Sequence, residues 1–379
     1  ELALLEAIDT GRPISDALSV DAPNSARVIQ WYAETIDKTY DEIAPAPRNA
    51  LAMVTREPLG VIGAVVPWNY PMMITSWKLG PALAMGNSIV VKPAENSSLS
   101  ALKMAELATA AGLPAGVFNV VPGLGSEAGQ ALARHMDVAK IAFTGSGPTG
   151  RKMMQYAAES NMKQVSLELG GKSPQVVLND CTDLEAAAST IAWAIYYNAG
   201  QTCNAGSRII VEKGVKEELF AHLHKFLESF VVGNQFDPAT QMAGLVSELQ
   251  RDRVNAYLDL VGQDGEKIVF GGEKTSGKDL LIKPTLVDNV KPGSRLAQEE
   301  IFGPVLVAID AKDEAEALQL ANGTEYGLAA SVWTSNVARA HKFARKLRAG
   351  TVWVNTFDML DVITPFGGFG ASGNGRDKS

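Results

Sequence analysis

Two cysteines occur in the chain, and one of them has the setting of a reactive thiol. Cys203 lies in "GQTCNAGSR", after an apolar helix-like run and before the strand-like run "RIIVE". A structural thiol normally lies inside an apolar run, whereas a turn between a helix and a strand opens the sulfur to a substrate. Because the thiolate is a strong nucleophile, this position is compatible with nucleophilic catalysis, and an inert thiol is the plain alternative. Cys181, in "NDCTDL", lies in no such motif and is interpreted as structural.

Two glycine-rich loops have the context of a phosphate-binding turn. "GSGPTG" (145–150) matches G-x-G-x-x-G after a strand pattern and before a helix pattern, and "GLGSEAG" (123–129) has one residue too many. Free N–H groups at a helix N-terminus attract a pyrophosphate. A strand-to-helix turn also needs glycine without any ligand, so both interpretations stay open. Glu168 follows "GSGPTG" near the spacing of the acidic residue that bonds a ribose.

Alternating strand and helix patterns would position these loops. Short apolar strands separated by helices favour parallel pairing with right-handed crossovers, which predicts a doubly wound α/β domain. A second α/β series begins near "SPQVVLND", and the polar, proline-bearing segment 41–58 between the first helices and the first strand is typical of a projecting hairpin. The predicted strands of the two series are "VIGAVVP", "SIVVKP", "GVFNVVPG", "KIAFTGS" and "QVSLELGG", then "SPQVVLND", "RIIVE", "KIVFGG", "GPVLVAI", "ASVWTS" and "TVWVN".

Composition narrows the class of protein. The 379 residues exceed one ordinary core, and 46% hydrophobic with 20% charged residues is typical of a soluble globular protein. A net charge of −8 gives no reason to expect nucleic acid or an anionic membrane surface, and no apolar run is long enough to span a bilayer. Two cysteines cannot form a disulfide framework, which favours the cytoplasm. The four histidines form no triad or ligand spacing, so we expect no metal.

Seven motifs together resemble one family. In order along the chain they are "PWNYP", "KPAE", "FTGS", "LELGGKSP", "GQTCNAGSR", "EEIFGPV" and "PFGGFGASGNGRDKS". The sequence is similar over its whole length to the aldehyde dehydrogenase superfamily. "DTGRPI", "SWKLGPALAMGNS" and "SGNGRDKS" look most like the branch that oxidises ω-aminoaldehydes, which includes γ-glutamyl-γ-aminobutyraldehyde and guanidinobutyraldehyde dehydrogenases. Relative to that family both ends of this chain look cut, which would remove part of the coenzyme domain and a C-terminal strand.

The resemblance implies a set of catalytic residues. Cys203 would attack the aldehyde, and the amide of Asn69 with the Cys203 N–H would hold the resulting oxyanion. Glu168 matches the general base, and Lys78 matches a lysine near that carboxylate, although a surface lysine is the plain alternative. The two interpretations of Glu168 conflict. We prefer the base, because "KPAE" supplies a better ribose site at the end of a strand.

The resemblance also implies a coenzyme, NAD with NADP possible. An acidic residue at Glu95 would repel the 2′-phosphate of NADP. The residues that match coenzyme-binding positions are Lys92 and Glu95 for the adenosine ribose, Gly125, Ser126 and Ser146 for the pyrophosphate, Glu300 and Phe302 for the nicotinamide and its ribose, and Trp68 for the coenzyme in general.

Substrate preference rests on fewer residues. Tyr70, Trp77 and Trp193 match positions that line the aldehyde tunnel, and aromatic faces can hold a cationic chain; as ordinary core they would need no substrate. Asp361, in "NTFDMLDVITPFGG", would place an acid at the tunnel mouth and attract a distal amine or guanidinium. Betaine-aldehyde-like or broad aliphatic specificity stays open.

The family's organisation predicts the domains and partners. The expected units are a Rossmann-like coenzyme domain (1–40 and 59–170), an oligomerisation hairpin (41–58), a second α/β catalytic domain (171–371) and the start of a C-terminal tail (372–379). A homodimer or homotetramer is the expected assembly. Two other classes stay open: a cysteine esterase or acyl transferase without redox chemistry, and an inactive structural homologue.

Overall fold

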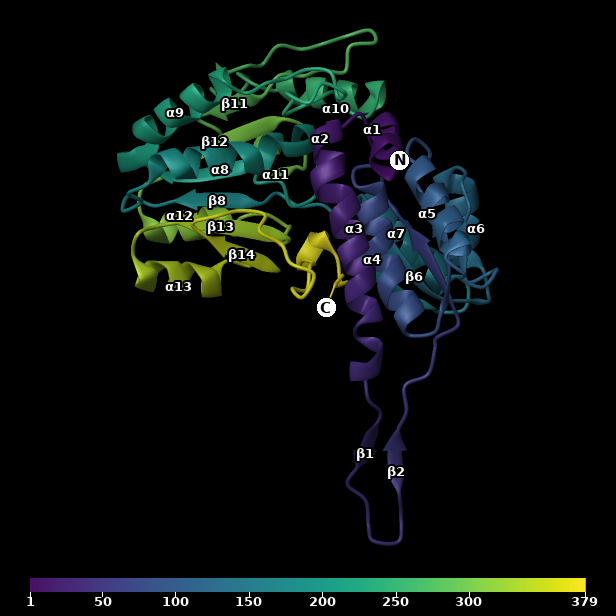
Figure 1. Ribbon diagram of the computed structural model, residues 1–379. Helices are drawn as coiled ribbons and strands as arrows, with labels where there is room; N and C mark the ends of the chain where they lie inside the picture. Colours follow the sequence, from purple (N-terminus) through teal and green to yellow (C-terminus); the bar gives the residue numbers. More distant parts are fainter. Residues whose placement is uncertain (379) are drawn as a thin grey trace.

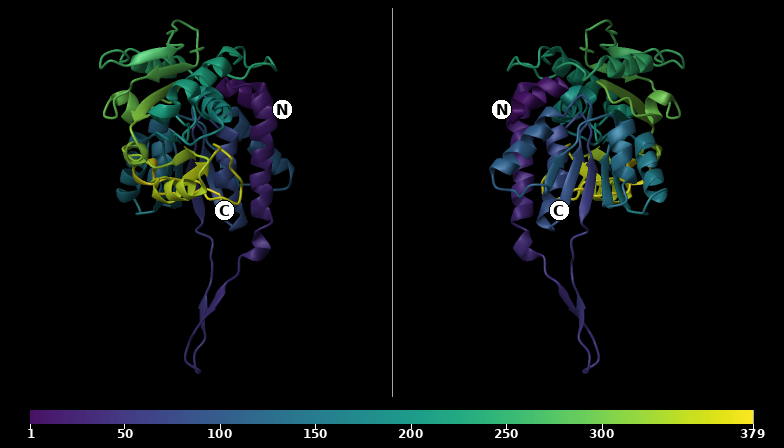
Figure 2. Two further views of the ribbon diagram at one scale, coloured as in Figure 1. Left: turned by 90° about the vertical axis from the view of Figure 1, so that its left-hand side faces the viewer. Right: turned by 90° about the vertical axis from the view of Figure 1, so that its right-hand side faces the viewer.

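A projecting arm and two α/β lobes make up the molecule (Figure 1). The structure is a computed structural model and describes residues 1–378. The arm is an antiparallel hairpin of β1 (Glu42–Ala44) and β2 (Ala52–Val54), which pairs Ile43 with Met53. Both views in Figure 2 show it extending away from the lobes, as the polar segment 41–58 predicted.

The first lobe is built on a parallel sheet in the order β5-β4-β3-β6-β7. Its strands are β3 (Val61–Val65), β4 (Ser88–Lys92), β5 (Phe118–Val120), β6 (Val138–Thr144) and β7 (Gln164–Glu168). The crossovers are α4 (Pro71–Ala84), α5 (Leu99–Ala110), the turn η3 (Gly125–Gly129) with α6 (Gln130–Arg134), and α7 (Gly147–Ala158). The predicted parallel α/β sheet is confirmed, and its carboxyl ends all lie at one edge.

The second lobe has a larger sheet in the order β10-β11-β12-β9-β8-β13-β14. Its pairs are parallel except at the edge, where β10 runs antiparallel to β11. The strands are β8 (Pro174–Val177), β9 (Arg208–Glu212), β10 (Lys267–Phe270), β11 (Thr285–Asp288), β12 (Val305–Ala311), β13 (Ala329–Trp333) and β14 (Thr351–Val354). The sequence pattern did not predict β11, because "TLVD" is a short run between polar segments.

Helices cover this sheet, and several of them begin at a side-chain cap. Asp183, Ser247, Asp313 and Asn336 each accept a hydrogen bond from an N–H of the first turn, which satisfies one of the free donors there. The helices are α8 (Leu184–Tyr196), η4 (Tyr197–Gly200), α9 (Lys213–Glu228), α10 (Glu248–Leu258), α11 (Arg295–Gln298), α12 (Glu314–Ala321) and α13 (Val337–Lys346).

The N-terminal helices lie against the first lobe. They are α1 (Leu2–Thr10), α2 (Ile14–Asp16), the turn η1 (Ala17–Asp21), α3 (Ala22–Ala33) and the short η2 (Ile36–Lys38). Helix α3 packs along α4, and the chain continues from it into the arm (Figure 1). No helix in residues 1–378 is both long and apolar enough to cross a membrane.

A glycine-rich segment late in the chain, 366–378, returns to the first lobe and contains the turn η5 (Gly370–Ser372). Gly373 forms an antiparallel bridge with Glu168, at the end of β7. The φ of Gly373 is 107°, and a Cβ there would lie 2.1 Å from the carbonyl oxygen of Leu167, so only glycine fits. The Asn374 side chain accepts a hydrogen bond from the Leu167 N–H at 3.0 Å. This contact joins the two lobes beside Glu168.

Candidate active site

Cys203 follows a turn of three consecutive residues with left-handed backbone angles. The φ values are 50° at Asn198, 53° at Ala199 and 71° at Gly200, directly after α8. A Cβ on Gly200 would also lie 2.1 Å from the carbonyl oxygen of Gly303. A left-handed conformation costs a non-glycine residue roughly 1–2 kcal/mol, so the contacts around this turn must hold it. The turn brings Cys203 to the wall of a cavity.

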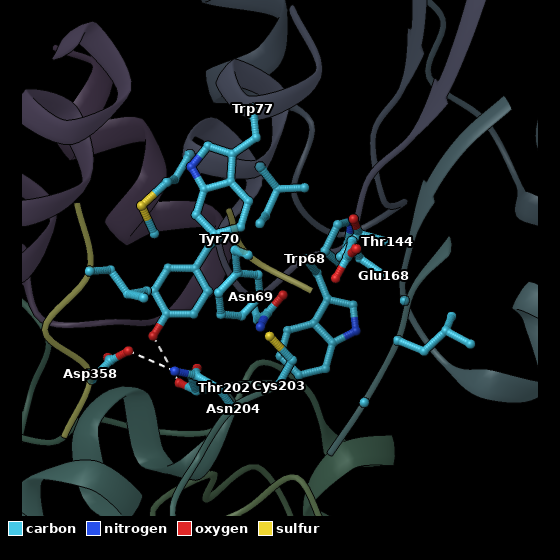
Figure 3. A pocket seen from close by; sticks show the side chains of 18 of the residues that line it. Trp68, Asn69, Tyr70, Trp77, Thr144, Glu168, Thr202, Cys203, Asn204 and Asp358 are labelled. Atoms are coloured by element: carbon cyan, nitrogen blue, oxygen red, sulfur yellow. Dashed lines mark hydrogen bonds between the residues drawn. The ribbon is translucent and has the colours of Figure 1, made fainter. Parts of the chain in front are cut away.

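Asn69 connects the first sheet to this turn. It follows β3 and is buried, and its Nδ2 donates a hydrogen bond to the Gln201 carbonyl oxygen at 2.9 Å. The backbone oxygen of Asn69 accepts from Asn198 Nδ2 at 3.2 Å. Figure 3 shows the amide of Asn69 beside the sulfur of Cys203. A carboxamide donor and a nucleophile from different lobes therefore share one site.

Tyr70 is fixed from two sides. Its hydroxyl and the Thr202 Oγ1 share a hydrogen bond of 2.8 Å (Figure 3). The guanidinium carbon of Arg12 lies 4.5 Å from the centre of the ring, and Arg12 forms a fully buried ion pair with Asp21 at 2.9 Å. Arg12 Nη2 also donates to the Tyr197 hydroxyl at 3.0 Å. The two tyrosines are thus rigid walls of the cavity.

Glu168 ends β7 as a buried, unsatisfied carboxylate. Its residue is 3% exposed, and neither side-chain oxygen has a hydrogen-bond partner within residues 1–378. Burial raises its pKa well above the usual range of a glutamate, and the charge of Asp377 adds to this rise, against Lys78 and Arg376. A carboxylate with a raised pKa is a better base when ionised, so Glu168 is suited to accept a proton.

Lys78 forms an ion pair that the sequence did not indicate. Its Nζ lies 2.5 Å from Asp377 Oδ2, and both side chains are buried. Asp377 belongs to the motif "GRDKS", but no spacing relates it to a lysine 299 residues earlier. The predicted lysine therefore lies near Glu168, together with a second carboxylate.

The surroundings of Cys203 disfavour its thiolate form. Burial raises its pKa well above the usual range, and the negative charges of Glu300, Glu168 and Asp358 contribute to the rise. Because the thiolate is the nucleophile, catalysis at Cys203 needs a base or a cation in the cavity.

Glu300 and Phe302 lie before β12 and face the first lobe. Glu300 Oε1 accepts a hydrogen bond from the Gly171 N–H at 3.1 Å, and burial raises the Glu300 pKa to about 7. The Phe302 ring meets Trp68 edge-on, with centroids 5.3 Å apart. The two predicted nicotinamide residues and Trp68, which was predicted to bind the coenzyme, line the same cavity as Cys203.

The other predicted coenzyme residues follow the carboxyl ends of neighbouring strands. Lys92 ends β4 and its Nζ lies 3.1 Å from Glu95 Oε1, which also accepts a hydrogen bond from the Gly125 N–H. Ser126 lies in η3. Ser146 precedes α7, and its hydroxyl bonds the Thr149 side chain instead of capping the helix. Helix α7 therefore has no side-chain cap, and uncapped N–H groups at the start of a helix attract anions.

The main cavity has a volume of about 300 Å³ and opens between the lobes. It includes the predicted substrate residues Tyr70, Trp77 and Asp361. The carboxylate of Asp361 is paired with Arg27, whose Nη2 lies 3.2 and 3.1 Å from the two oxygens. Other lining residues, which the sequence did not single out, are Val20, Met73, Tyr197, Asn204, Asp358, Phe366 and Lys378.

Trp193 does not line the main cavity. It lines a neighbouring cavity and packs edge-on against Phe226 and Phe230, with centroids 6.3 and 5.1 Å away. Within residues 1–378 no group of three or more His, Cys, Asp or Glu side chains could hold a metal ion.

Comparisons with known proteins agree with this geometry. The sequence matches the aldehyde dehydrogenase family over residues 1–379. It is 50% identical to the NADP/NAD-dependent aldehyde dehydrogenase PuuC of Escherichia coli, covering 100% of this chain and 76% of that protein. Two similar crystal structures cover 100% of this chain and 77% of theirs at 51% identity. One is γ-glutamyl-γ-aminobutyraldehyde dehydrogenase from Burkholderia cenocepacia (TM-score 0.96), and the other is the P. syringae AldA indole-3-acetaldehyde dehydrogenase with NAD+ and IAA (TM-score 0.97).

Sequence, fold and the arrangement around Cys203 thus lead to one classification, and the chain belongs to the aldehyde dehydrogenase family.

Proposed function

We propose that this protein oxidises an aldehyde to the carboxylate, with NAD(P)+ as oxidant and Cys203 as nucleophile. The observation that carries the proposal is the convergence of Cys203, Asn69 and Glu168 with Glu300 and Phe302 in one cavity. A cysteine esterase would need the first three and not the last two. A structural homologue would need none of the five together.

The roles follow from the contacts. The Cys203 sulfur adds to the aldehyde carbon, and the Asn69 amide and the Cys203 N–H donate to the oxyanion. Loss of one such donor typically costs about 2.7–4 kcal/mol of transition-state stabilisation. Bound NAD(P)+ supplies the hydride acceptor for this oxidation. The resulting acyl group on Cys203 is released by water, whose proton goes to Glu168.

The Lys78–Asp377 pair gives Glu168 a neighbour of each charge. The ammonium of Lys78 favours the ionised form of Glu168, and Asp377 opposes it. We infer that Lys78 favours the ionised form of Glu168, which is the form that accepts a proton from water. The buried position of both side chains isolates them from bulk water.

The chain's own residues fit a dinucleotide. Glu95 would accept from the adenosine ribose beside Lys92, and the uncapped start of α7 would face the phosphates. Gly125 and Ser126 would lie beside them, and Glu300 would accept from the nicotinamide ribose. The negative charge of Glu95 favours NAD+ over NADP+. The P. syringae relative was crystallised with NAD+, which supports this coenzyme.

We propose an ω-amino- or guanidino-aldehyde as substrate. The Burkholderia protein, which is named for γ-glutamyl-γ-aminobutyraldehyde, supports this class. The cavity combines aromatic walls with carboxylates, which suits a cationic chain. The similarity to an indole-3-acetaldehyde dehydrogenase supports a neutral aldehyde as the second candidate.

The first test is NADH formation from γ-aminobutyraldehyde and from propionaldehyde, with Cys203→Ala as control. Faster NADH formation with the aminoaldehyde, abolished in the variant, is the expected result. Equal rates on both aldehydes would favour broad specificity. Ester hydrolysis without NADH formation from any aldehyde would favour the esterase.

We further propose that the hairpin 41–58 mediates a homodimer or homotetramer. The large side chains Ile43, Leu51 and Met53 are all more than half exposed there, and such surfaces usually contact a partner. The other proposed units are a coenzyme-binding domain (1–40 and 59–170), a catalytic domain that contains the nucleophile (171–371) and the start of a C-terminal tail (372–379). Sedimentation of a chain with 45–50 replaced by a short turn would show monomers if the hairpin is the interface.

A further inference from the structure

A second cavity adjoins the main one and has no role in the chemistry described so far. Its volume is about 270 Å³, close to that of the main cavity. The shared part of the wall lies near the nucleophile, because Thr202 directly precedes Cys203. Residues common to both cavities are Val20, Tyr197, Thr202, Asn204 and Asp358, and the second cavity adds Thr190, Trp193, Ala194 and Phe357. We call it the side cavity.

Asp358 is the carboxylate of the common wall. Its Oδ1 accepts a hydrogen bond from Asn204 Nδ2 at 2.6 Å (Figure 3), and its backbone is held in the left-handed region at φ 57°. Among residues 1–378, no cationic nitrogen lies within 4 Å of this carboxylate. Its field reaches Cys203 and Tyr70, whose pKa values it raises in addition to burial. Burial raises the pKa of Asp358 to about 6, and the hydrogen bond from Asn204 and the charge of Lys378, acting from beyond ion-pair distance, oppose this rise. The side cavity therefore has a carboxyl group in its wall that makes no direct ion pair with another described residue.

Asp361, three residues later, differs in the property that matters. Arg27 pairs with both of its oxygens, and the side chains of the pair are 62% and 45% exposed. Solvent and the guanidinium together cancel most of the attraction that Asp361 could exert on a substrate. The charge of Asp361, which the sequence analysis placed at the tunnel mouth, is thus largely neutralised. Asp358, which the sequence analysis did not single out, makes no such ion pair within the described part of the chain.

The aromatic residues of the side cavity suit the same ligand. The rings of Trp193 and Tyr197 belong to its wall, and each is fixed, Trp193 by Phe230 and Tyr197 by Arg12. A cation gains about 0.5–2 kcal/mol over such a ring. In the main cavity Lys378 lies over Trp77, with Nζ 5.0 Å from the ring centre. That face of Trp77 already has a cation, whereas no cation-π contact of this kind involves Trp193 among the described residues.

We propose that the side cavity binds the distal ammonium or guanidinium of the aldehyde, with Asp358 as its ionic partner and Trp193 and Tyr197 as its walls. The inference rests on the proposed aldehyde oxidation and names the group that selects its substrate. A guanidinium fits best, because its plane stacks on an aromatic ring while its edge donates to a carboxylate.

The kinetic test compares Asp358→Asn with the matched control Asp361→Asn. Substrates are γ-guanidinobutyraldehyde, γ-aminobutyraldehyde and pentanal, a neutral aldehyde of the same length as the second. We expect Asp358→Asn to lower kcat/KM for the two cations by about 10- to 100-fold, mainly through KM, which is the loss of one charged hydrogen bond. Pentanal should change by less than about 2-fold, and Asp361→Asn should change every substrate by less than about 5-fold.

Two results would overturn the assignment. An equal loss on pentanal would mean that Asp358 acts through Asn204 and the Cys203 turn. A larger loss of kcat/KM for the two cationic substrates in Asp361→Asn than in Asp358→Asn would mean that the cation binds at the tunnel mouth. Trp193→Leu adds an independent check, since it should weaken guanidinobutyraldehyde more than pentanal.

A binding test separates this inference from the oxidation itself. Butylguanidine, which has no aldehyde, is titrated by calorimetry into Cys203→Ala and into the same variant carrying Asp358→Asn. Binding only to the first supports the subsite even if no aldehyde yields NADH, in which case only the proposed function fails. Equal binding to both, or none to either, refutes the subsite whatever the oxidation assay shows.

Discussion

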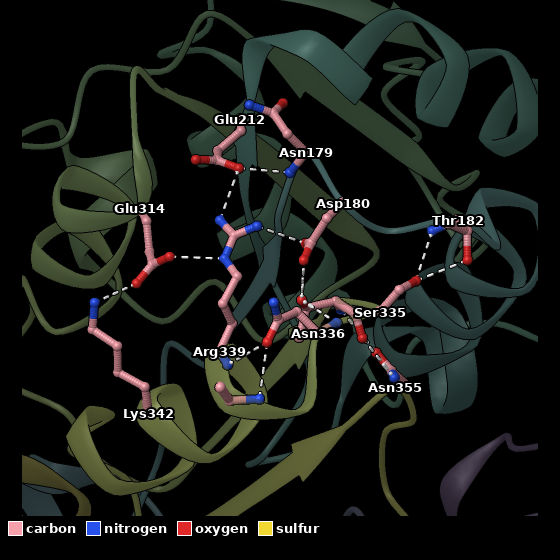
Figure 4. Close-up of polar contacts among 12 residues, drawn as sticks. Asn179, Asp180, Thr182, Glu212, Glu314, Ser335, Asn336, Arg339, Lys342 and Asn355 are labelled. Atoms are coloured by element: carbon pink, nitrogen blue, oxygen red, sulfur yellow. Dashed lines mark hydrogen bonds and ion pairs between the residues drawn. The ribbon is translucent and has the colours of Figure 1, made fainter.

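The cavity around Cys203 and the ionic cluster around Arg339 use the same residue types in opposite ways. In the cluster, which joins α13 to the second sheet, Arg339 pairs with Asp180 at 2.8 Å, Glu314 at 2.7 Å and Glu212 at 3.5 Å (Figure 4). Lys342 also pairs with Glu314, and the hydrogen bonds of Lys342 and Arg339 lower the Glu314 pKa.

In the cavity, by contrast, burial raises the pKa of Glu168 and of Glu300. Glu168 has no hydrogen-bond donor within residues 1–378. A carboxylate whose donors are all supplied by the protein holds elements together, whereas one left without donors is available to a substrate or water. The two regions differ in how many hydrogen bonds and ion pairs the protein supplies to each carboxylate, and not in residue type.

The largest effect should come from Glu168→Gln. It removes the base and keeps the shape, so steady-state NADH formation should fall by about 100- to 10,000-fold. Thermal unfolding should not worsen, because the variant removes a buried carboxylate that has no partner. A lower melting temperature with full activity would mean that Glu168 serves stability and not catalysis, which would contradict the contrast between the two regions.

Arg339→Ala should do the opposite. Three carboxylates lose their shared donor, and we expect about 2 kcal/mol of lost stability in urea unfolding, with NADH formation per folded molecule unchanged. Arg339→Lys should recover part of the stability, since it restores the charge without the forked geometry. A loss of kcat in folded Arg339→Ala would show that the cluster also serves the site.

Stability should depend on pH with opposite sign in the two regions. The folded-state pKa of Glu168 is raised, so the folded chain binds the extra proton above pH 4.5. This contribution to the free energy of unfolding falls as pH rises from 4.5 toward the raised pKa, by up to about 1.4 kcal/mol per pH unit. Glu168→Gln should flatten that decline in melting temperature, and an unchanged slope would contradict the raised pKa.

Glu314→Gln should give the smallest effect, on the acid side. Its folded-state pKa is lowered, so its contribution is present above pH 4.5 and disappears as pH falls through the lowered value. The partly exposed position limits the loss to about 1 kcal/mol or less. Wild type and variant should therefore converge in stability at low pH and differ at neutral pH.

Local features of the sequence were sufficient to predict much of the fold and of the candidate site. The glycines of "GSGPTG" and the setting of Cys203 predicted a turn after a strand and a thiol facing a cavity, because turn chemistry acts over a few residues. Our proposal that Asp358, and not Asp361, binds the substrate cation depends on how the segment after β14 returns to the cavity. No periodicity in the sequence encodes that path. The Lys78–Asp377 pair joins two lobes, and single-chain spacing carries no signal for it.

The return of segment 366–378 to β7 sets the order in which the site is completed during synthesis. Leu167 and Asn374, which are hydrogen-bonded, are 207 residues apart. At roughly 5–20 residues per second, a ribosome adds that length in about 10–40 s. Through that interval the nascent chain can form the first sheet and then present Cys203, while Glu168 has neither the bridge from Gly373 nor the neighbouring charge of Asp377. The part of the Glu168 pKa rise that comes from Asp377 begins only when segment 366–378 has been made and has docked.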